Sequence, residues 1–346
     1  MAGSRSLLEA RIAAYGEAID VAAATVVNTG TPEHQGLYDM VRYHLGWQDR
    51  GGTPSKAPGK KLRPTLCFLV AEALGADWKI ALPAATAVEL VHNFSLIHDD
   101  IQDQSRLRRH QEAVWAVWGI AQGINAGDAL LIIAEQAIAD VEPHLPPERA
   151  LGAYRLLLDA CRALCEGQYL DLLWENAPAI TVDQYLGMIE RKTASLFACT
   201  AELGAYCAGA DAPTRSAFHD FGQALGLAFQ VADDVLGIWG PEQETGKSAA
   251  LDLISRKKTL PVLLGLDSRF GPIADRLREL FAKDSPLTIE EAQQTAHWLE
   301  ELGTREQTLA YLNRYTGEAM QMLQRAAPGE NAQLLKDFLA STLPIM

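Results

Sequence analysis

The chain has 346 residues, 48% of them hydrophobic and 21% charged, which is enough apolar material for a large packed core. Its net charge of −14 argues against nucleic acid as a partner, because a phosphate backbone needs a basic footprint. No apolar run approaches the ~18 residues of a membrane span, the N-terminus has no signal-peptide core, and the five cysteines form no CxxC pair, so we expect a cytoplasmic protein without stable membrane insertion.

Helical periodicity runs through the chain. Apolar residues first recur at Leu8, Ile12, Tyr15 and Ile19, and long helices are predicted at 130–141, 155–173, 185–203 and 218–238. Turn-rich loops lie between helices, with Thr181 and Thr214 as expected N-caps. We find no convincing strand pattern. The sequence therefore predicts a single all-α domain over 1–346, with about a dozen helices around a central cavity.

The stretch SLIHDDIQDQSRLRRH (95–110) crowds three carboxylates onto about one helical turn. Asp99 and Asp103 are four residues apart and share a helix face, and Asp100 lies beside them. Like charges at this spacing are destabilising unless something neutralises them. The apolar run Phe94–Ile97 before them argues against an ordinary solvated acidic face. Oxygen-rich sites of this kind suit Mg²⁺, which also takes up substrate phosphates and water.

A second acidic pair, Asp233 and Asp234, follows another apolar helical stretch, in FQVADDVLGIWG. If the two acidic clusters face one another across a cavity, they could hold several Mg²⁺ ions against a diphosphate. A lone acidic pair is weak support for such a site, but the pairs occur together with downstream basic residues.

With these motifs the chain resembles the trans-isoprenyl diphosphate synthases of the polyprenyl synthetase family over about residues 40 to 265. DDIQD (99–103) resembles the family's DDxxD motif, and Asp233–Asp234 resembles the opening of its second aspartate motif. The other resembling segments are GKKLRP (59–64), LRRH (107–110), NAGDALL (125–131), EGQYLDL (166–172), KTASLF (192–197), GLAFQVADD (226–234) and GKSAALDLISRKKTLP (246–261).

The resemblance implies an all-α isoprenoid synthase fold and a condensation of isopentenyl diphosphate with an allylic diphosphate (dimethylallyl, geranyl or farnesyl). About three Mg²⁺ ions, bound by Asp99, Asp103 and Asp233, would assist departure of pyrophosphate from the allylic carbon. The isopentenyl double bond would attack the resulting cation, and pyrophosphate would take up the released proton. No side-chain nucleophile is required.

The resemblance also implies roles for individual residues. The catalytic residues would be Asp99, Asp100, Asp103, Lys192, Asp233 and Asp234. The isopentenyl diphosphate site would contain Lys60, Arg63, His92 and Arg109. The allylic diphosphate site would contain Arg108, Lys192, Thr193, Gln230, Lys247 and Lys257. Guanidinium groups suit these sites because they match phosphate oxygens bidentately.

Product length would depend on the depth of an apolar cavity below the first aspartates. Phe94, five residues before Asp99, would form its floor beside the small Ser95, because a packed interior rejects overlap. This combination resembles short-chain synthases that make the C20 product, geranylgeranyl diphosphate. The C15 product, farnesyl diphosphate, is the alternative.

The chain departs from the family pattern at several positions. Gly237 replaces the last aspartate of the second motif, and His110 replaces the glycine that usually follows the paired arginines. Further departures are Pro58, Lys61, Ala250 and Arg256.

Two other functions stay open. A class I terpene cyclase would use the same aspartates but would not need the residues of an isopentenyl diphosphate site, Lys60, Arg63, His92 and Arg109. A non-catalytic subunit of a heteromeric prenyl synthase would tend to lose the first aspartate motif, which is intact here. The resemblance further implies a homodimer, while the downstream pathway is left open.

Overall fold

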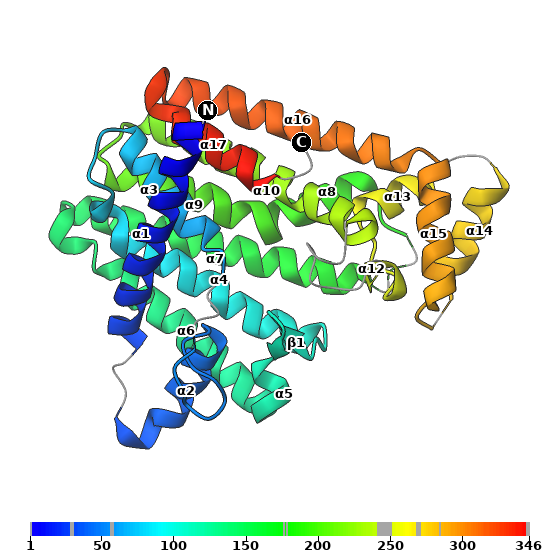
Figure 1. The fold of residues 1–346 in the computed structure, drawn as a ribbon, viewed down its shortest axis with the longest axis horizontal. Helices are drawn as coiled ribbons and strands as arrows, with labels where there is room; N and C mark the ends of the chain where they lie inside the picture. Colours follow the sequence, from blue (N-terminus) through cyan, green and yellow to red (C-terminus); the bar gives the residue numbers. More distant parts are fainter. Residues whose placement is uncertain are drawn as a thin grey trace. The chain divides into compact units, whose positions relative to one another are not determined.

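Figure 1 shows a computed structural model of the chain, which describes residues 2–27, 31–55, 59–175, 177, 179–240, 251–267, 271–283 and 285–343. Helices dominate these residues, and the all-α prediction is confirmed. The chain forms two compact units. Unit 1 comprises Met1–Cys161, Leu196–Gly222 and Met322–Ser341, and unit 2 comprises Arg162–Ser195, Gln223–Gln321 and Thr342–Met346. The single domain expected over 1–346 stays a prediction.

Most elements of the first half belong to unit 1. They are α1 (Ala2–Val27), η1 (Pro32–His34), α2 (Gln35–His44), α3 (Leu62–Ala73), η2 (Trp78–Ala81), α4 (Leu82–Gln102), β1 (Leu107–Arg108), β2 (Gln111–Glu112), α5 (Val114–Trp118), α6 (Ile120–Ala139), η3 (Glu142–His144) and the start of α7 (Pro147–Glu175).

The remaining elements follow in chain order. They are α8 (Val182–Ile189), η4 (Glu190–Ala194), α9 (Ser195–Cys207), α10 (Ala212–Trp239), α12 (Leu251–Ile254), α13 (Leu260–Asp267), α14 (Pro272–Phe281), α15 (Ile289–Glu301), α16 (Thr304–Ala326), η5 (Glu330–Ala332) and α17 (Gln333–Thr342).

Helix α4 is the central helix of unit 1 and packs against α1, α3 and α6. The predicted apolar stripe of α1 is buried at Leu8, Tyr15 and Ile19. The ring of Tyr15 lies 4.9 Å from Phe68 and 5.2 Å from Trp78, centroid to centroid, so an aromatic cluster fixes α1 to α3 and η2. This packing holds α4, which carries the first aspartate motif, in a rigid frame.

One stretch, Trp78–Gln102, is long and apolar enough to cross a membrane, contrary to the expectation from the sequence. Most of it is α4, and 67% of its most apolar 18-residue window is buried inside the protein. Core packing therefore accounts for its apolar composition.

Unit 2 has its own core. Ile238, Leu253, Val262, Leu277, Ala292 and Leu299 form its buried cluster. These residues come from α10, α12, α13, α14 and α15, so one apolar cluster fixes the end of the helix that carries the second aspartate pair.

The helix predicted at 185–203 is interrupted. Helix α8 begins at a capping box, in which Thr181 and Gln184 each accept a backbone N–H, so the predicted Thr181 cap is confirmed. The five residues of η4 then form a π-helical turn before α9 begins. The predicted cap at Thr214 is wrong, because α10 begins earlier and Asp211 accepts the Thr214 N–H at 3.0 Å.

The structure contains a short hairpin that the sequence did not indicate. Strands β1 and β2 pair antiparallel, with Leu107 opposite Glu112. Arg109 and His110 form the turn, and both have positive φ angles, 52° and 65°. Two-residue hairpins favour this conformation, but it normally selects Asn-Gly because a Cβ is strained there. His110 therefore stands at a position where the family's glycine would be relaxed.

We expect His110→Gly to raise the free energy of unfolding by about 0.5–1 kcal/mol. Glycine relieves the strain of the left-handed conformation, but it also makes the unfolded chain more flexible, which offsets part of the gain. Urea titration of the two proteins measures this difference. His110→Ala keeps the Cβ and serves as the control. Equal stability of the glycine and alanine variants would contradict the role given to backbone strain.

Candidate active site

The predicted site residues fall into two groups. The first aspartate motif and the arginines lie in unit 1, and the second aspartate pair and most of the lysines lie in unit 2.

The first aspartates occupy the last turn of α4, and Asp103 is its C-cap. The side chain of Asp99 is 22% exposed and Asp103 is exposed, whereas the side chain of Asp100 is only 1% exposed. The C-terminal end of a helix already carries a partial negative charge. Two outward carboxylates at this position create a strongly negative surface.

Arg108 neutralises the buried member of this cluster. Its Nη2 lies 2.6 Å and its Nε 3.0 Å from Asp100 Oδ1, and Nη2 lies 3.5 Å from Asp99 Oδ2. Burial lowers the pKa of Arg108, but the hydrogen bonds to Asp100 and the charges of Asp100, Asp99 and Asp103 raise it overall. The hairpin arginine therefore offsets the repulsion within the aspartate turn.

The outward aspartates suit a hard divalent cation such as Mg²⁺. They offer carboxylate oxygens at a helix end whose last carbonyl groups lack intrahelical partners. Within the described ranges, no three His, Cys, Asp or Glu side chains are grouped to hold a metal. Water or substrate oxygens would therefore have to complete the coordination, which is usual for Mg²⁺.

Arg109 and Arg63 lie near a buried carboxylate, Glu89, which is 6% exposed. Burial raises the pKa of Glu89, against the hydrogen bond from Asn93 and the charges of Arg109, Arg63 and Lys61. Burial lowers the pKa of Arg63 to about 10, against the charge of Glu89. The guanidinium of Arg63 also lies 4.4 Å above the ring of Phe197.

His92 belongs to the same cationic group. Burial lowers its pKa well below the ordinary value, and the charges of Arg63, Arg109 and Arg108 lower it further. It is therefore a neutral imidazole, able to donate one hydrogen bond. The structure thus brings three predicted isopentenyl diphosphate ligands, Arg63, His92 and Arg109, into one electrostatic cluster.

The remaining members of GKKLRP have separate positions. Lys60 is exposed. Lys61 donates to the Gly16 carbonyl at 3.0 Å and pairs with Asp20, so it fastens α1 to the start of α3. A Cβ at Gly59 would lie 2.8 Å from Arg109 Nη2, so the absent side chain leaves room for that guanidinium.

In unit 2, the second aspartate pair shows the same division as the first. Asp233 is exposed and Asp234 is 2% exposed. Asp234 accepts hydrogen bonds from the Tyr185 hydroxyl at 2.5 Å and the Leu260 N–H at 3.0 Å, which link α8, α10 and α13. Burial raises the pKa of Asp234 to about 7, although these hydrogen bonds and one from Gln230 lower it.

The allylic-site residues of unit 2 lie around two carboxyl groups, Asp171 and Asp234. Lys192 Nζ lies 2.5 Å from Asp171 Oδ2. Burial raises the pKa of Asp171, but the charges of Lys257 and Lys192 lower it overall. Thr193 donates to Gln230 Oε1 at 2.8 Å, and Gln230 donates to Asp234 at 3.2 Å. Two of the predicted ligands, Lys192 and Lys257, therefore surround Asp171, and the other two, Thr193 and Gln230, are hydrogen bonded in series to Asp234.

The π turn positions Lys192 and Thr193. A Cβ at Gly167 would lie 2.2 Å from the backbone nitrogen of Lys192, so α7 and the π turn are in direct backbone contact. π turns are frequent at functional sites.

Sequence reasoning missed three residues. Asp171 lies in the EGQYLDL segment (166–172), but the sequence alone indicates no role for it. Glu89 and Asn93 were visible only as polar interruptions in the apolar sequence of α4.

The departures from the family pattern have local explanations where the structure describes them. A Cβ at Gly237 would lie 2.5 Å from Asp252 Oδ2, so another carboxylate occupies space beside the missing aspartate. Arg256 has a φ angle of 56°, and its Nη1 donates to the Phe281 carbonyl at 3.3 Å, so it ties the end of α12 to α14. Lys247, Pro58 and Ala250 lie outside the described residues.

The residues predicted to form the chain-length floor lie on α4. Phe94 is 5% exposed, and its ring packs edge-on against His98 with 5.6 Å between centroids. Ser95 is half-buried and donates to the His92 carbonyl at 2.8 Å. A Cβ at Gly127 would lie 2.2 Å from His98, so the His98 ring is held directly against α6.

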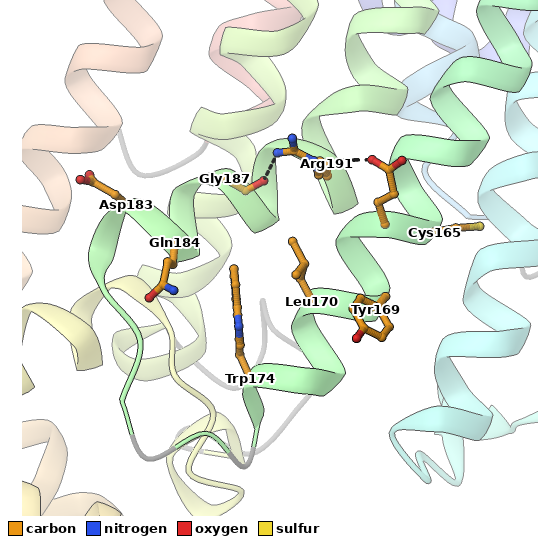
Figure 2. Close-up of a pocket in the computed structure, with 9 residues that line it drawn as sticks. Cys165, Tyr169, Leu170, Trp174, Asp183, Gln184, Gly187 and Arg191 are labelled. Atoms are coloured by element: carbon orange, nitrogen blue, oxygen red, sulfur yellow. Dashed lines mark hydrogen bonds and ion pairs between the residues drawn. The ribbon is translucent and has the colours of Figure 1, made fainter.

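Unit 2 also contains a hollow of about 680 Å³ between α7 and α8. Figure 2 shows Trp174, Tyr169 and Leu170 on α7. Arg191 donates a hydrogen bond to the Gly187 carbonyl. Arg191 also pairs with Glu166 at 3.7 Å. None of the predicted ligands lines this hollow.

The motifs and the helical fold match known proteins. The profile of the polyprenyl synthetase family matches residues 53–299, and the chain belongs to this family. The polyprenyl synthetase from Streptomyces coelicolor A3(2) has a crystal structure that superposes with a TM-score of 0.87 at 35% identity, covering 98% of this chain and 99% of that one.

Two relatives of this chain are named for products of different chain length. A (2E,6E)-farnesyl diphosphate synthase from Mycobacterium bovis is 48% identical over 225 residues, which are 64% of this chain but only 61% of that protein. A geranylgeranyl diphosphate synthase from Methanosarcina mazei is 39% identical over 286 residues, covering 83% of this chain and 82% of that protein.

Burial of the His44 imidazole makes the stability of the folded protein depend on pH. Burial lowers the pKa of His44 to about 3, helped by the charges of Arg109 and Arg108 and opposed by hydrogen bonds with Asn93. Because the unfolded chain then binds more protons between pH ~6.5 and ~3, His44 removes stability as the pH falls through this window.

We expect His44→Phe to cost about 1 kcal/mol at pH 7.5, because a larger ring must fit at a position that is only 3% exposed. Thermal unfolding from pH 7.5 to 4 should show this deficit shrinking and then reversing, as only the wild type must protonate His44 on unfolding. A deficit independent of pH would contradict a neutral His44 in the folded protein.

Proposed function

We propose that this protein is a trans-prenyltransferase that condenses isopentenyl diphosphate with an allylic diphosphate to give a short-chain all-trans prenyl diphosphate. The observation that carries the proposal is the aspartate turn of α4 with its two outward carboxylates, its buried Asp100 and the arginine hairpin. Membership of the polyprenyl synthetase family and the two named relatives support it.

The metal would be Mg²⁺, about three ions for each active site, bound by Asp99, Asp103 and Asp233. When bound, it supplies positive charge that stabilises a departing pyrophosphate. Each motif offers at least one outward carboxylate for this task and keeps a second one buried and hydrogen bonded.

The other residues bind and orient the two diphosphates. Arg108, Lys192, Thr193, Gln230 and Lys257 would contact the allylic diphosphate, with Lys247 from outside the described residues. Arg63, His92 and Arg109 would bind isopentenyl diphosphate together with the exposed Lys60. The carbon–oxygen bond of the allylic diphosphate breaks, the isopentenyl double bond attacks the cation, and the proton passes to pyrophosphate.

The product would be C20 geranylgeranyl diphosphate, with C15 farnesyl diphosphate as the alternative. The bulk of Phe94 at the core of unit 1 supports a short product. The relatives include a farnesyl and a geranylgeranyl diphosphate synthase, so both lengths occur among similar proteins.

The protein would act as a homodimer in the cytoplasm. Helix α6 exposes Ile120, Ile124 and Ile132, at 55%, 43% and 53%. Successive four-residue steps along α6 pass through Ile120, Ile124, the exposed Asp128 and Ile132, so these isoleucines form a largely apolar strip, interrupted by one carboxylate, that would face a second copy.

Purified protein with Mg²⁺, labelled isopentenyl diphosphate and each allylic primer should elongate the primer. Asp103→Asn should lower kcat/KM by about 10³-fold, because a ligand for the charge-stabilising cation is weakened. Asp140→Asn, at the matching C-cap position of α6, is the control and should leave activity unchanged.

The same assay separates the alternatives. A cyclic hydrocarbon formed from a longer diphosphate would support a terpene cyclase. Absence of turnover unless a partner protein is added would support a non-catalytic subunit.

We expect Phe94→Ala to lengthen the product by one or more isoprene units, because the floor residue would be truncated. Chromatography of the dephosphorylated products measures the chain length. Leu69→Ala, a truncation in the buried core of α3, is the control for loosened packing. Unchanged product length in Phe94→Ala would refute the floor assignment.

We expect Ile124→Glu to shift the protein from dimer to monomer, because it places a charge in the proposed apolar interface. Light scattering coupled to gel filtration measures the mass. Val21→Glu changes a similarly exposed residue on α1 and should remain dimeric. A dimeric Ile124→Glu variant would exclude the α6 strip as the interface.

A further inference from the structure

Asn93 connects α4 to the arginine hairpin. It is 1% exposed, and its Oδ1 accepts a hydrogen bond from Arg109 Nη2 at 3.3 Å. Its Nδ2 donates to the Glu89 carbonyl at 2.8 Å and to Glu89 Oε1 at 3.0 Å. One buried amide therefore joins a carboxylate on the preceding helical turn to a guanidinium sixteen residues further along the chain.

The carboxylate of Glu89 fixes which way the amide faces. The Asn93 amide nitrogen donates to two acceptors of Glu89, its backbone carbonyl and its carboxylate, and neither can donate while the carboxylate is ionised. The amide oxygen is therefore left to face Arg109, which can only donate. In the reversed orientation, the amide N–H groups would face a guanidinium and both donors would be unsatisfied in a buried site.

Arg109 needs such an anchor because its backbone is strained. Its φ angle of 52° lies in the left-handed region, which is unfavourable for a residue with a Cβ. Gly59 leaves space on one side of the guanidinium, and Asn93 supplies a directional acceptor on the other. Strain of this kind persists where the surrounding structure holds it, commonly at functional sites.

We infer that Asn93 is a positioning residue for Arg109, and that Glu89 sets the orientation of the Asn93 amide so that Arg109 is aimed at the non-allylic diphosphate. This inference rests on the proposed function. The neighbouring Arg108 has a different anchor, Asp100, on the same face of α4 two turns later. The two arginines are thus held independently, which lets the protein set its affinity for the two substrates separately.

The first test is steady-state kinetics of Asn93→Leu, which keeps the side-chain size but removes the acceptor. The KM for isopentenyl diphosphate should rise about tenfold, while the KM for the allylic diphosphate should stay within twofold. Asn313→Leu, at an exposed position of α16, is the matched control. An equal rise in both KM values would indicate a general structural role and overturn the inference.

A double-mutant cycle shows whether Asn93 acts through Arg109. In an Arg109→Gln background, adding Asn93→Leu should change the KM for isopentenyl diphosphate by less than twofold, because the anchored group is already absent. A further tenfold loss would show independent action and overturn the inference.

Substitutions at Glu89 test the amide orientation and remain informative if Asn93→Leu does not fold. Glu89→Gln and Glu89→Met both remove the negative charge, so their electrostatic effects on a diphosphate cancel in the comparison. Both variants keep the backbone carbonyl of residue 89, but only glutamine keeps a side-chain acceptor for Asn93. The KM for isopentenyl diphosphate should be about fivefold higher in the methionine variant than in the glutamine variant, and equal values would overturn the inference.

Binding of inorganic pyrophosphate separates this inference from the proposed function. If the wild type elongates no primer, the proposed function has failed, yet calorimetry can still compare anion binding. About tenfold weaker binding of pyrophosphate by Asn93→Leu than by the wild type would support the positioning role. Equal binding would overturn it.

Discussion

Repulsion among the carboxylates at the end of α4 is the constraint on which the rest of unit 1 depends. Three aspartates lie within five residues, at the helix end where the backbone dipole is also negative. Arg108 offsets this repulsion by directing two N–H groups to the buried Asp100. The short hairpin with its two strained turn residues is the device that brings Arg108 to this position.

The two aspartate pairs follow the same rule in different surroundings. In each pair the second carboxyl group is buried and accepts hydrogen bonds. Asp100 accepts from Arg108, and Asp234 accepts from Tyr185, Gln230 and the Leu260 N–H. The first carboxylate of each pair remains accessible. A buried anchor thus holds the end of each helix, and its neighbour along the chain remains accessible.

The sequence predicted the helices well because long apolar periodicity depends on many residues at once. It could not predict β1 and β2, since two-residue strands carry no alternation, nor the π turn, which differs from an α-helix by a single residue. The motif residues were identifiable by their spacing. Their partners were not, because the contact of Arg109 with Asn93 and that of Lys192 with Asp171 depend on how distant segments pack. Glu89 was visible as a charge in an apolar run, but only the fold shows which cations surround it.

The π turn between α8 and α9 has a consequence for how this sequence can change. A π turn holds one residue more than an α-helix of the same course, so a one-residue deletion within 190–194 would leave an unbroken helix from 182 to 207. The π turn absorbs the extra residue as a bulge, so the helical turns on either side would keep their faces, and only the residues of the turn itself would change position. The backbone contact with Gly167 would be lost along with the alignment of Lys192 on Asp171. The extra residue of the π turn is therefore what brings Lys192 to Asp171, although the helices on either side would follow the same course without it.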